Sequence, residues 1–235
     1  MSTISDLIKE NGWSSYGLAL PRAPEVPSVQ AHLGSPWWQS WPTHLQQACA
    51  YPGLVYEIST LPGSGATSFA LTALMVCRAQ QKTAREQKWL LGIELPEYQL
   101  NGAALSALGL SHDALVMARP PKEQIPLMTL QAVRSGLFAG IFIDLSDEKI
   151  LRKWKTPSRR LLLAARDSNT AVWFQTHRTP LRSGPFWSHV KIDVCVTHDM
   201  LDIKIKKHNQ GSAPWRGSIL HPAIWHLSHH KQLFV

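Results

Sequence analysis

The sequence predicts a mixed α/β fold in which a mostly parallel sheet is flanked by helices and finished by a C-terminal antiparallel hairpin. Two observations carry this prediction. Short apolar runs alternate with helical segments between residues 54 and 175, as in successive strand–helix–strand units. Residues 190–197 and 201–207 instead alternate apolar with polar side chains and turn at His198 and Asp199, the pattern of a half-exposed antiparallel pair.

Composition sets limits on the class of protein. The chain has 235 residues, enough to bury a full α/β core as one domain. It contains no uncharged run near 18 residues and begins without the features of a secretory signal, so we expect a cytoplasmic protein without membrane contacts. Cys49, Cys77 and Cys195 form no CxxC pair and are expected to be buried thiols. The net charge of +8 favours a polyanion such as DNA, or an acidic protein face, as partner.

Three regions are predicted along the chain. Residues 1–52 comprise a short amphipathic helix at residues 1–11 and an arm rich in proline, which we expect to be extended because proline removes a backbone donor and restricts its predecessor. Residues 53–220 form the core, and residues 221–235 form a tail rich in histidine and aromatic residues. In the arm, Trp37, Trp38 and Trp41 either pack onto their own domain or anchor a partner.

A phosphate cradle is predicted in the first strand–helix unit. An apolar strand at residues 54–58 is followed by a turn with Gly63, Ser64 and Gly65, and a helix opens at Ala66 or Thr67. Glycines let backbone N–H groups close on an anion at a helix N-terminus. The phosphate-binding motif GxxxxGK[ST] is incomplete, because Ala66 stands at the lysine position. An ordinary turn without a ligand is the alternative.

Further strands and helices follow in the predicted order. Apolar strands are expected at residues 89–93, 115–118, 139–144 and 170–174, and helices at residues 100–108, 125–135 and 159–165. Glu94 and Glu97 follow the first of these strands, at the edge where open α/β sheets gather working residues. Asp144 ends a buried strand, where a carboxylate can hold Mg²⁺ through water, and Gln175 ends the last one.

This succession resembles the RecA-like recombinase core over residues 54–220. The resemblance rests on the runs KWLLGIELPEYQL, SALGLSHDAL, RPP, LQAVRSG, AGIFIDLSD, RRLLLAARDSNTAVWFQTHR and VKIDVCVTHDMLDIKIKKHNQGSAPWRGSIL. It implies that Glu97 corresponds to the water-activating glutamate, Asp144 to the magnesium aspartate and Gln175 to the phosphate-sensing glutamine. It also places Ala66 on the essential lysine, so that the catalytic set is incomplete.

Within that superfamily the chain is most similar to the ImuA/SulA-type branch, on its ALGL, QAVRSG and RRLLLAARDSN elements and its degenerate cradle. The resemblance implies an accessory of error-prone translesion synthesis in the bacterial response to DNA damage. Its partners would be RecA and an ImuB-like Y-family polymerase. We expect a pseudo-ATPase with no catalytic residue and neither ATP nor Mg²⁺ as a cofactor. The alternatives are an active DNA-dependent ATPase or recombinase paralogue, and a SulA-like inhibitor of cell division.

Two further surfaces are predicted from charge and aromatic content. The predicted DNA-binding residues are Arg178, Arg182, Trp187, Lys204, Lys206 and Lys207. The alternative is a solvated strand face whose charges keep the sheet edge from pairing with other chains. In the tail, Trp225, Leu233 and Phe234 are predicted to contact a partner. The tail histidines match no standard zinc spacing, so no metal site is expected.

Overall fold

A computed structural model provides the structure of the chain. It describes residues 36–61, 63–81, 88–95, 100, 105, 108, 110, 114–145, 154–177, 188–208 and 214–222. The predicted N-terminal helix, most of the predicted helix at residues 100–108 and the tail beyond Pro222 lie outside these ranges. None of the helices within them is both long and apolar enough to cross a membrane.

The fold is the predicted mixed α/β arrangement, and it is consistent with a RecA-like core. In the described part of the chain, eight strands form one sheet in the order β3-β2-β4-β5-β1-β6-β7-β8. Neighbouring strands are parallel in the part of the sheet with the order β3-β2-β4-β5-β1-β6. The strand pairs β6–β7 and β7–β8 are antiparallel. The strands are β1 (Val55–Thr60), β2 (Trp89–Ile93), β3 (Leu115–Ala118), β4 (Phe138–Asp144), β5 (Ala171–His177), β6 (Val190–Thr197), β7 (Met200–His208) and β8 (Trp215–Leu220).

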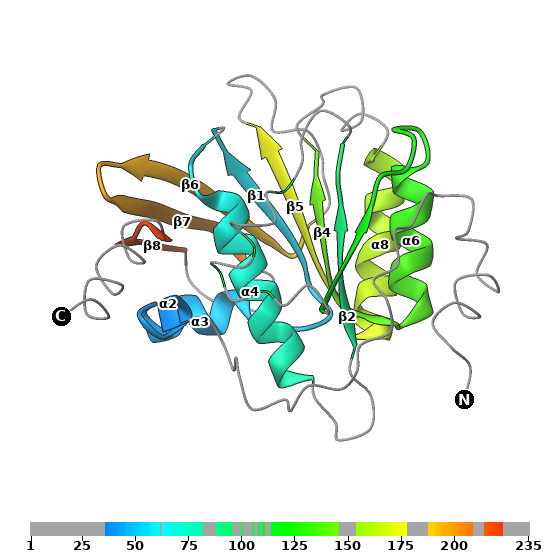
Figure 1. Cartoon of the computed structure of the whole chain (residues 1–235), viewed down its shortest axis with the longest axis horizontal. Coiled ribbons are helices and arrows are strands. Elements are labelled where there is room, and N and C mark those ends of the chain that lie inside the picture. Colours follow the sequence, from blue (N-terminus) through cyan, green and yellow to red (C-terminus); the bar gives the residue numbers. More distant parts are fainter. Residues whose placement is uncertain are drawn as a thin grey trace.

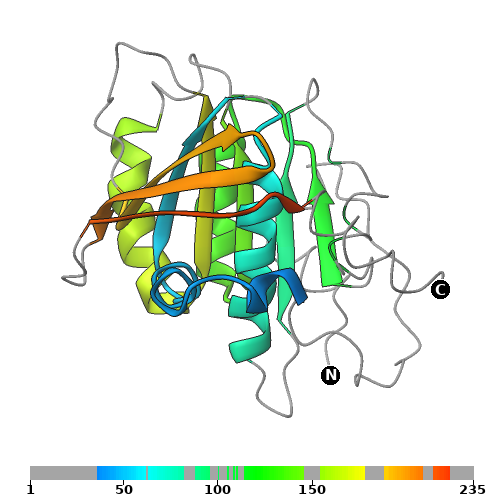
Figure 2. The same ribbon diagram turned by 90° about the vertical axis from the view of Figure 1, so that its left-hand side faces the viewer.

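Helices cover both faces of this sheet (Figures 1 and 2). One face carries α2 (Pro36–Gln39), α3 (Thr43–Cys49) and α4 (Ala66–Gln80), which share a core cluster with the apolar side chains of β6 and β7. The other face carries α6 (Ile125–Ser135) and α8 (Lys155–Ser168), which pack against each other and enclose a second cluster. Alternate residues of the central strands point into the two clusters, so these strands are apolar on both sides.

The arm is not extended where the structure describes it. Residues 36–39 and 43–49 are helical, contrary to the prediction. Pro36 is the first residue of α2 and Pro42 caps α3, positions at which a missing backbone N–H breaks no helical hydrogen bond. The predictions also missed β8, and α8 is longer than the predicted helix at residues 159–165.

The three arm tryptophans belong to the core. Trp37, Trp38 and Trp41 expose at most 8% of their surface, so in this conformation they pack their own domain and cannot anchor a partner. Trp41 stacks on Phe69 of α4 with ring centroids 4.4 Å apart, and the indole N–H of Trp37 donates to the Leu220 carbonyl of β8 at 2.9 Å. Burial of large aromatic surface and these specific contacts hold the segment in place.

Candidate functional site

The candidate site lies at the carboxyl ends of the central strands. There β1 ends at Thr60, the glycine turn follows, and α4 begins at Ala66. Because β5 lies between β1 and β4, the sheet register sets Gln175 beside both Ile58 and Asp144. The topology therefore brings the predicted cradle, the predicted magnesium aspartate and the predicted sensing glutamine to one edge, where parallel α/β sheets bind ligands.

The turn has the two left-handed glycines that a cradle would need, although the backbone N–H of Ser64 donates to the carbonyl of Leu61 at 3.3 Å. Gly63 and Gly65 have φ values of 75° and 73°, a region that side chains with a Cβ rarely adopt. The carbonyl of Gly65 accepts the first hydrogen bond of α4 from Phe69 N–H at 3.0 Å. The hydroxyls of Thr60 and Ser64 are hydrogen-bonded to each other, so both polar side chains of the turn are satisfied within the chain.

The start of α4 lacks the cation of a magnesium-nucleotide site. Ala66 is 2% exposed and presents a methyl group where a phosphate-binding lysine would reach the outer phosphates. The hydroxyl of Thr67, which is the position that holds the metal in such a site, donates to Oε1 of Gln175 at 2.8 Å. Gln175 is itself buried, so the predicted sensing glutamine is paired with the threonine that the phosphate-binding motif retains. The turn therefore keeps two left-handed glycines but lacks the lysine charge of a nucleotide site.

His221, which directly follows the edge strand β8, packs against the glycine turn. A Cβ added to Gly65 would lie 2.8 Å from Nε2 of His221 and 3.3 Å from Leu201, so the imidazole covers one side of the turn. The backbone N–H of His221 donates to the carbonyl of Asp199 at 2.7 Å, which fixes the residue beside the β6–β7 turn.

Partial burial lowers the pKa of His221, and the nearby carboxylate of Asp199 opposes this shift without reversing it. The neutral imidazole is therefore favoured at neutral pH. Sequence reasoning placed His221 in the tail and missed this contact, because no local signal relates it to Gly65.

The acidic residues after β2 have different outcomes. Glu94 is buried and structural: it pairs with Arg119 at 2.9 Å and accepts the backbone N–H of Leu100. It therefore ties the ends of β2 and β3 to the following chain. Glu97, the predicted water-activating residue, lies outside the described residues.

The predicted DNA-binding residues are only partly described. Arg178, Arg182 and Trp187 lie outside the described ranges, as do the predicted partner-binding residues Trp225, Leu233 and Phe234, and the side chain of Lys207 is also not described.

Lys204 and Lys206 are exposed on β7. Nζ of Lys206 is 2.6 Å from a carboxylate oxygen of Asp193, and sheet register sets Asp193 and Arg216 on either side of Lys204. This face therefore mixes both signs of charge, as the solvated-strand alternative expects.

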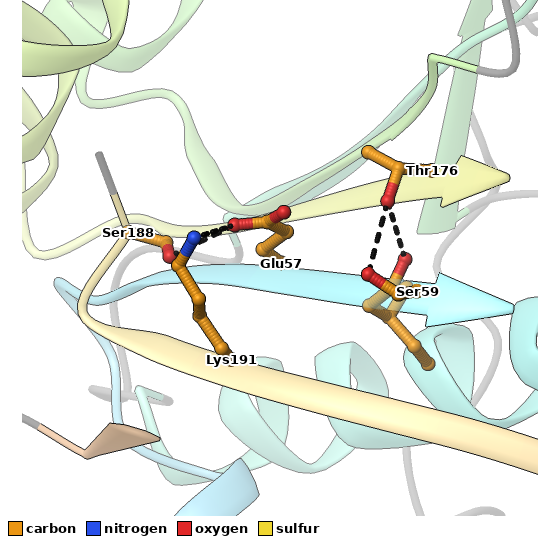
Figure 3. A network of polar contacts seen from close by, with 6 residues as sticks. Glu57, Ser59, Thr176, Ser188 and Lys191 are labelled. Carbon is orange, nitrogen blue, oxygen red and sulfur yellow. Dashed lines mark hydrogen bonds and ion pairs between the residues drawn. The ribbon is translucent and has the colours of Figure 1, made fainter. Parts of the chain in front are cut away.

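A polar network on the sheet was not predicted. The carboxylate of Glu57 on β1 forms an ion pair with Nζ of Lys191 on β6 at 2.9 Å (Figure 3). It also accepts a hydrogen bond from the hydroxyl of Ser188 at 3.2 Å. Beside it, the hydroxyls of Ser59 and Thr176 are 3.3 Å apart. Alternation of polar with apolar residues in VYEIST and VKIDV was the signal that could have revealed it. The network satisfies half-buried polar groups where β5, β1 and β6 adjoin.

The fold and this edge define a class: an α/β protein whose first strand is joined to the following helix by a turn with two left-handed glycines and with alanine at the first helical position. A scan against models of known protein families finds none that matches the chain, and a search of curated proteins finds no significant match.

Proposed function

We propose that the chain is a non-catalytic RecA-fold accessory protein of the DNA-damage response. It supports error-prone translesion synthesis by binding an ImuB-like Y-family polymerase, RecA or both. It uses the nucleotide scaffold as a shape for recognition and turns over no ATP.

One observation carries the proposal: a buried alanine begins α4 where a P-loop ATPase has its lysine. Phosphoryl transfer depends on positioning and on positive charge at the transferred group, and an alanine methyl supplies neither. The 2.8 Å hydrogen bond that Thr67 donates to Gln175 adds to this, because it engages the predicted sensing glutamine within the chain. The RecA-like resemblance of residues 54–220 supplies the expected partners.

The first experiment measures nucleotide binding and turnover. The purified chain is titrated with a fluorescent ATP analogue and assayed for phosphate release with and without DNA, beside the Ala66→Lys and Ser68→Lys variants. Ser68→Lys places the same charge on the same turn of α4 away from the motif position. We expect no turnover in the wild type. Micromolar analogue affinity together with DNA-stimulated turnover in the wild type would overturn the proposal in favour of an active ATPase.

The second experiment measures partner choice with purified proteins. The chain is immobilised and exposed separately to RecA, to an ImuB-like polymerase and to the tubulin-like division protein. Capture of RecA or the polymerase is the expected result. Capture of the division protein alone would favour a SulA-like inhibitor and contradict the translesion role.

A further inference from the structure

The outer surface formed by α6 and α8 combines exposed leucines with arginines. We name this surface the α6–α8 face, and it comprises Leu127, Arg134, Arg159, Arg160, Leu163 and Arg166. Leu163 and Leu127 are 63% and 52% exposed, the first and third most exposed of the large apolar side chains in the described chain. The two helices lie side by side (Figure 1) and are packed against each other.

Helical spacing gathers these side chains on one surface. On α8, Arg159, Leu163 and Arg166 are separated by four and three residues, and Arg160 precedes Leu163 by three, so all four adjoin on the exposed side. On α6, Leu127 and Arg134 are seven residues apart and both exposed. A cleft of about 460 Å³ runs between the helices, lined by Arg134, Arg160, Leu163, Ala164, Asp167 and Ser168.

The charge of the face is strongly one-sided. Four arginines stand against a single carboxylate, that of Asp167, across the sequences of the two helices. Among the described residues, no ion pair involves any of these arginines. Arginine gives up its hydration more readily than lysine and binds carboxylates bidentately, which suits it to protein interfaces.

We propose that the α6–α8 face docks an acidic segment of a partner protein, with an apolar side chain of that segment seated on Leu163. Positive charge on the face requires negative charge on the occupant, and the exposed leucines require apolar surface. Nucleic acid meets only the first requirement, because phosphates leave the leucines in water. A second copy of the chain that docks through the same face offers the apolar surface but not the negative charge, because a symmetric contact sets arginine against arginine.

This inference deepens the proposed function by giving the partner a place to bind. The face lies on the opposite side of the sheet from α4, so a bound segment leaves the helix that begins at the cradle uncovered. The surface is also independent of whether the cradle takes a nucleotide. If neither RecA nor the polymerase binds, the proposed function is contradicted. This inference is not, because its test uses a probe of defined chemistry.

The probe is a fluorescein-labelled helical peptide with a leucine stripe and glutamates elsewhere, and binding to the full chain is followed by anisotropy. Two variants alter the face: Arg159→Glu/Arg160→Glu changes its charge and Leu163→Ser its apolar contact. The matched control is Lys204→Glu/Arg216→Glu, which makes the same charge change on exposed positions of β7 and β8. Circular dichroism verifies that each variant is folded.

We expect the charge variant to weaken peptide binding about tenfold or more, since two contacts become repulsive. Leu163→Ser should weaken it several-fold, the control pair should change it little, and a peptide with lysine in place of glutamate should not bind. Added salt should weaken binding, because exposed charges are screened over about 10 Å at 0.1 M.

Three results would overturn the proposal. The first is equal loss of binding in the control pair, which would mean attraction to the whole basic chain. The second is full binding in Leu163→Ser. The third is tighter binding of a DNA oligonucleotide with the same sensitivity to Arg159 and Arg160, which would assign the face to nucleic acid.

Discussion

Replacement of Gly65 by alanine tests whether His221 closes the cradle. The new methyl group would have two separate effects. Alanine is strained at the φ of 73° that this position adopts, which costs about 1 kcal/mol. It would also stand 2.8 Å from Nε2 of His221, so the imidazole must be displaced from a position that its backbone bond to Asp199 helps to fix. We estimate this second cost at about 1–2 kcal/mol, within the range for overpacked sites.

Gly63 provides the matched control. Its φ is 75°, but apart from its chain neighbours no atom of the described residues lies within 4 Å of an added Cβ, so Gly63→Ala carries the backbone cost alone. We therefore expect Gly63→Ala to lower the free energy of unfolding by about 1 kcal/mol and Gly65→Ala to lower it by about 2–3 kcal/mol. In a His221→Ala background the cost of Gly65→Ala should fall to that of Gly63→Ala.

Urea denaturation followed by circular dichroism gives the free energy of unfolding of the wild type and of each variant, and hence the double-mutant cycle of positions 65 and 221. The coupling of about 1–2 kcal/mol between positions 65 and 221 exceeds the roughly 0.5 kcal/mol within which distant sites add. Equal losses for Gly63→Ala and Gly65→Ala, with an additive cycle, would show that His221 does not cover the turn.

Two further predictions concern titratable groups. Burial raises the pKa of Cys77 to about 12 and that of Cys49 well above its usual range. A thiol reagent near neutral pH should therefore label Cys195 alone in the folded chain, and all three thiols after unfolding. Fast labelling of more than one thiol in the folded chain would contradict the structure. Burial lowers the pKa of His221 in the folded chain, so the unfolded chain binds a proton at this histidine more readily. The free energy of unfolding should therefore fall as the pH drops from about 6.5 toward the lower pKa that His221 has in the folded chain. Denaturation series over this range should show the fall in the wild type and less of it in His221→Ala, and parallel curves would refute the assignment.

Much of the fold could be predicted because its elements carry local signals. Buried parallel strands are continuous apolar runs bounded by polar residues. The helix at residues 125–135 has the predicted bounds, and Gly136 caps its C-terminus. The hairpin of β6 and β7 followed from period-two alternation with its turn at His198 and Asp199. These signals lie within a few residues of the feature that they predict.

The arm helices and the closure of the site could not be predicted in the same way. Pro36 and Pro42 indicate an extended arm until it is known that each stands at a helix start, where proline is tolerated. The pairing of Thr67 with Gln175 joins positions 108 residues apart, and only the sheet order brings them together. Period, spacing and propensity carry no information about such contacts.

The bond from Trp37 to the carbonyl of Leu220 spans 183 residues and joins the segment ahead of the first strand to the last described strand. The tryptophan-bearing segment therefore cannot reach its final position during synthesis until almost all of the core has left the ribosome. Assembly of this domain should be slow for its size, since such long closures are formed late. A fusion or truncation that removes β8 should leave the early segment undocked, with its aromatic surface open to aggregation.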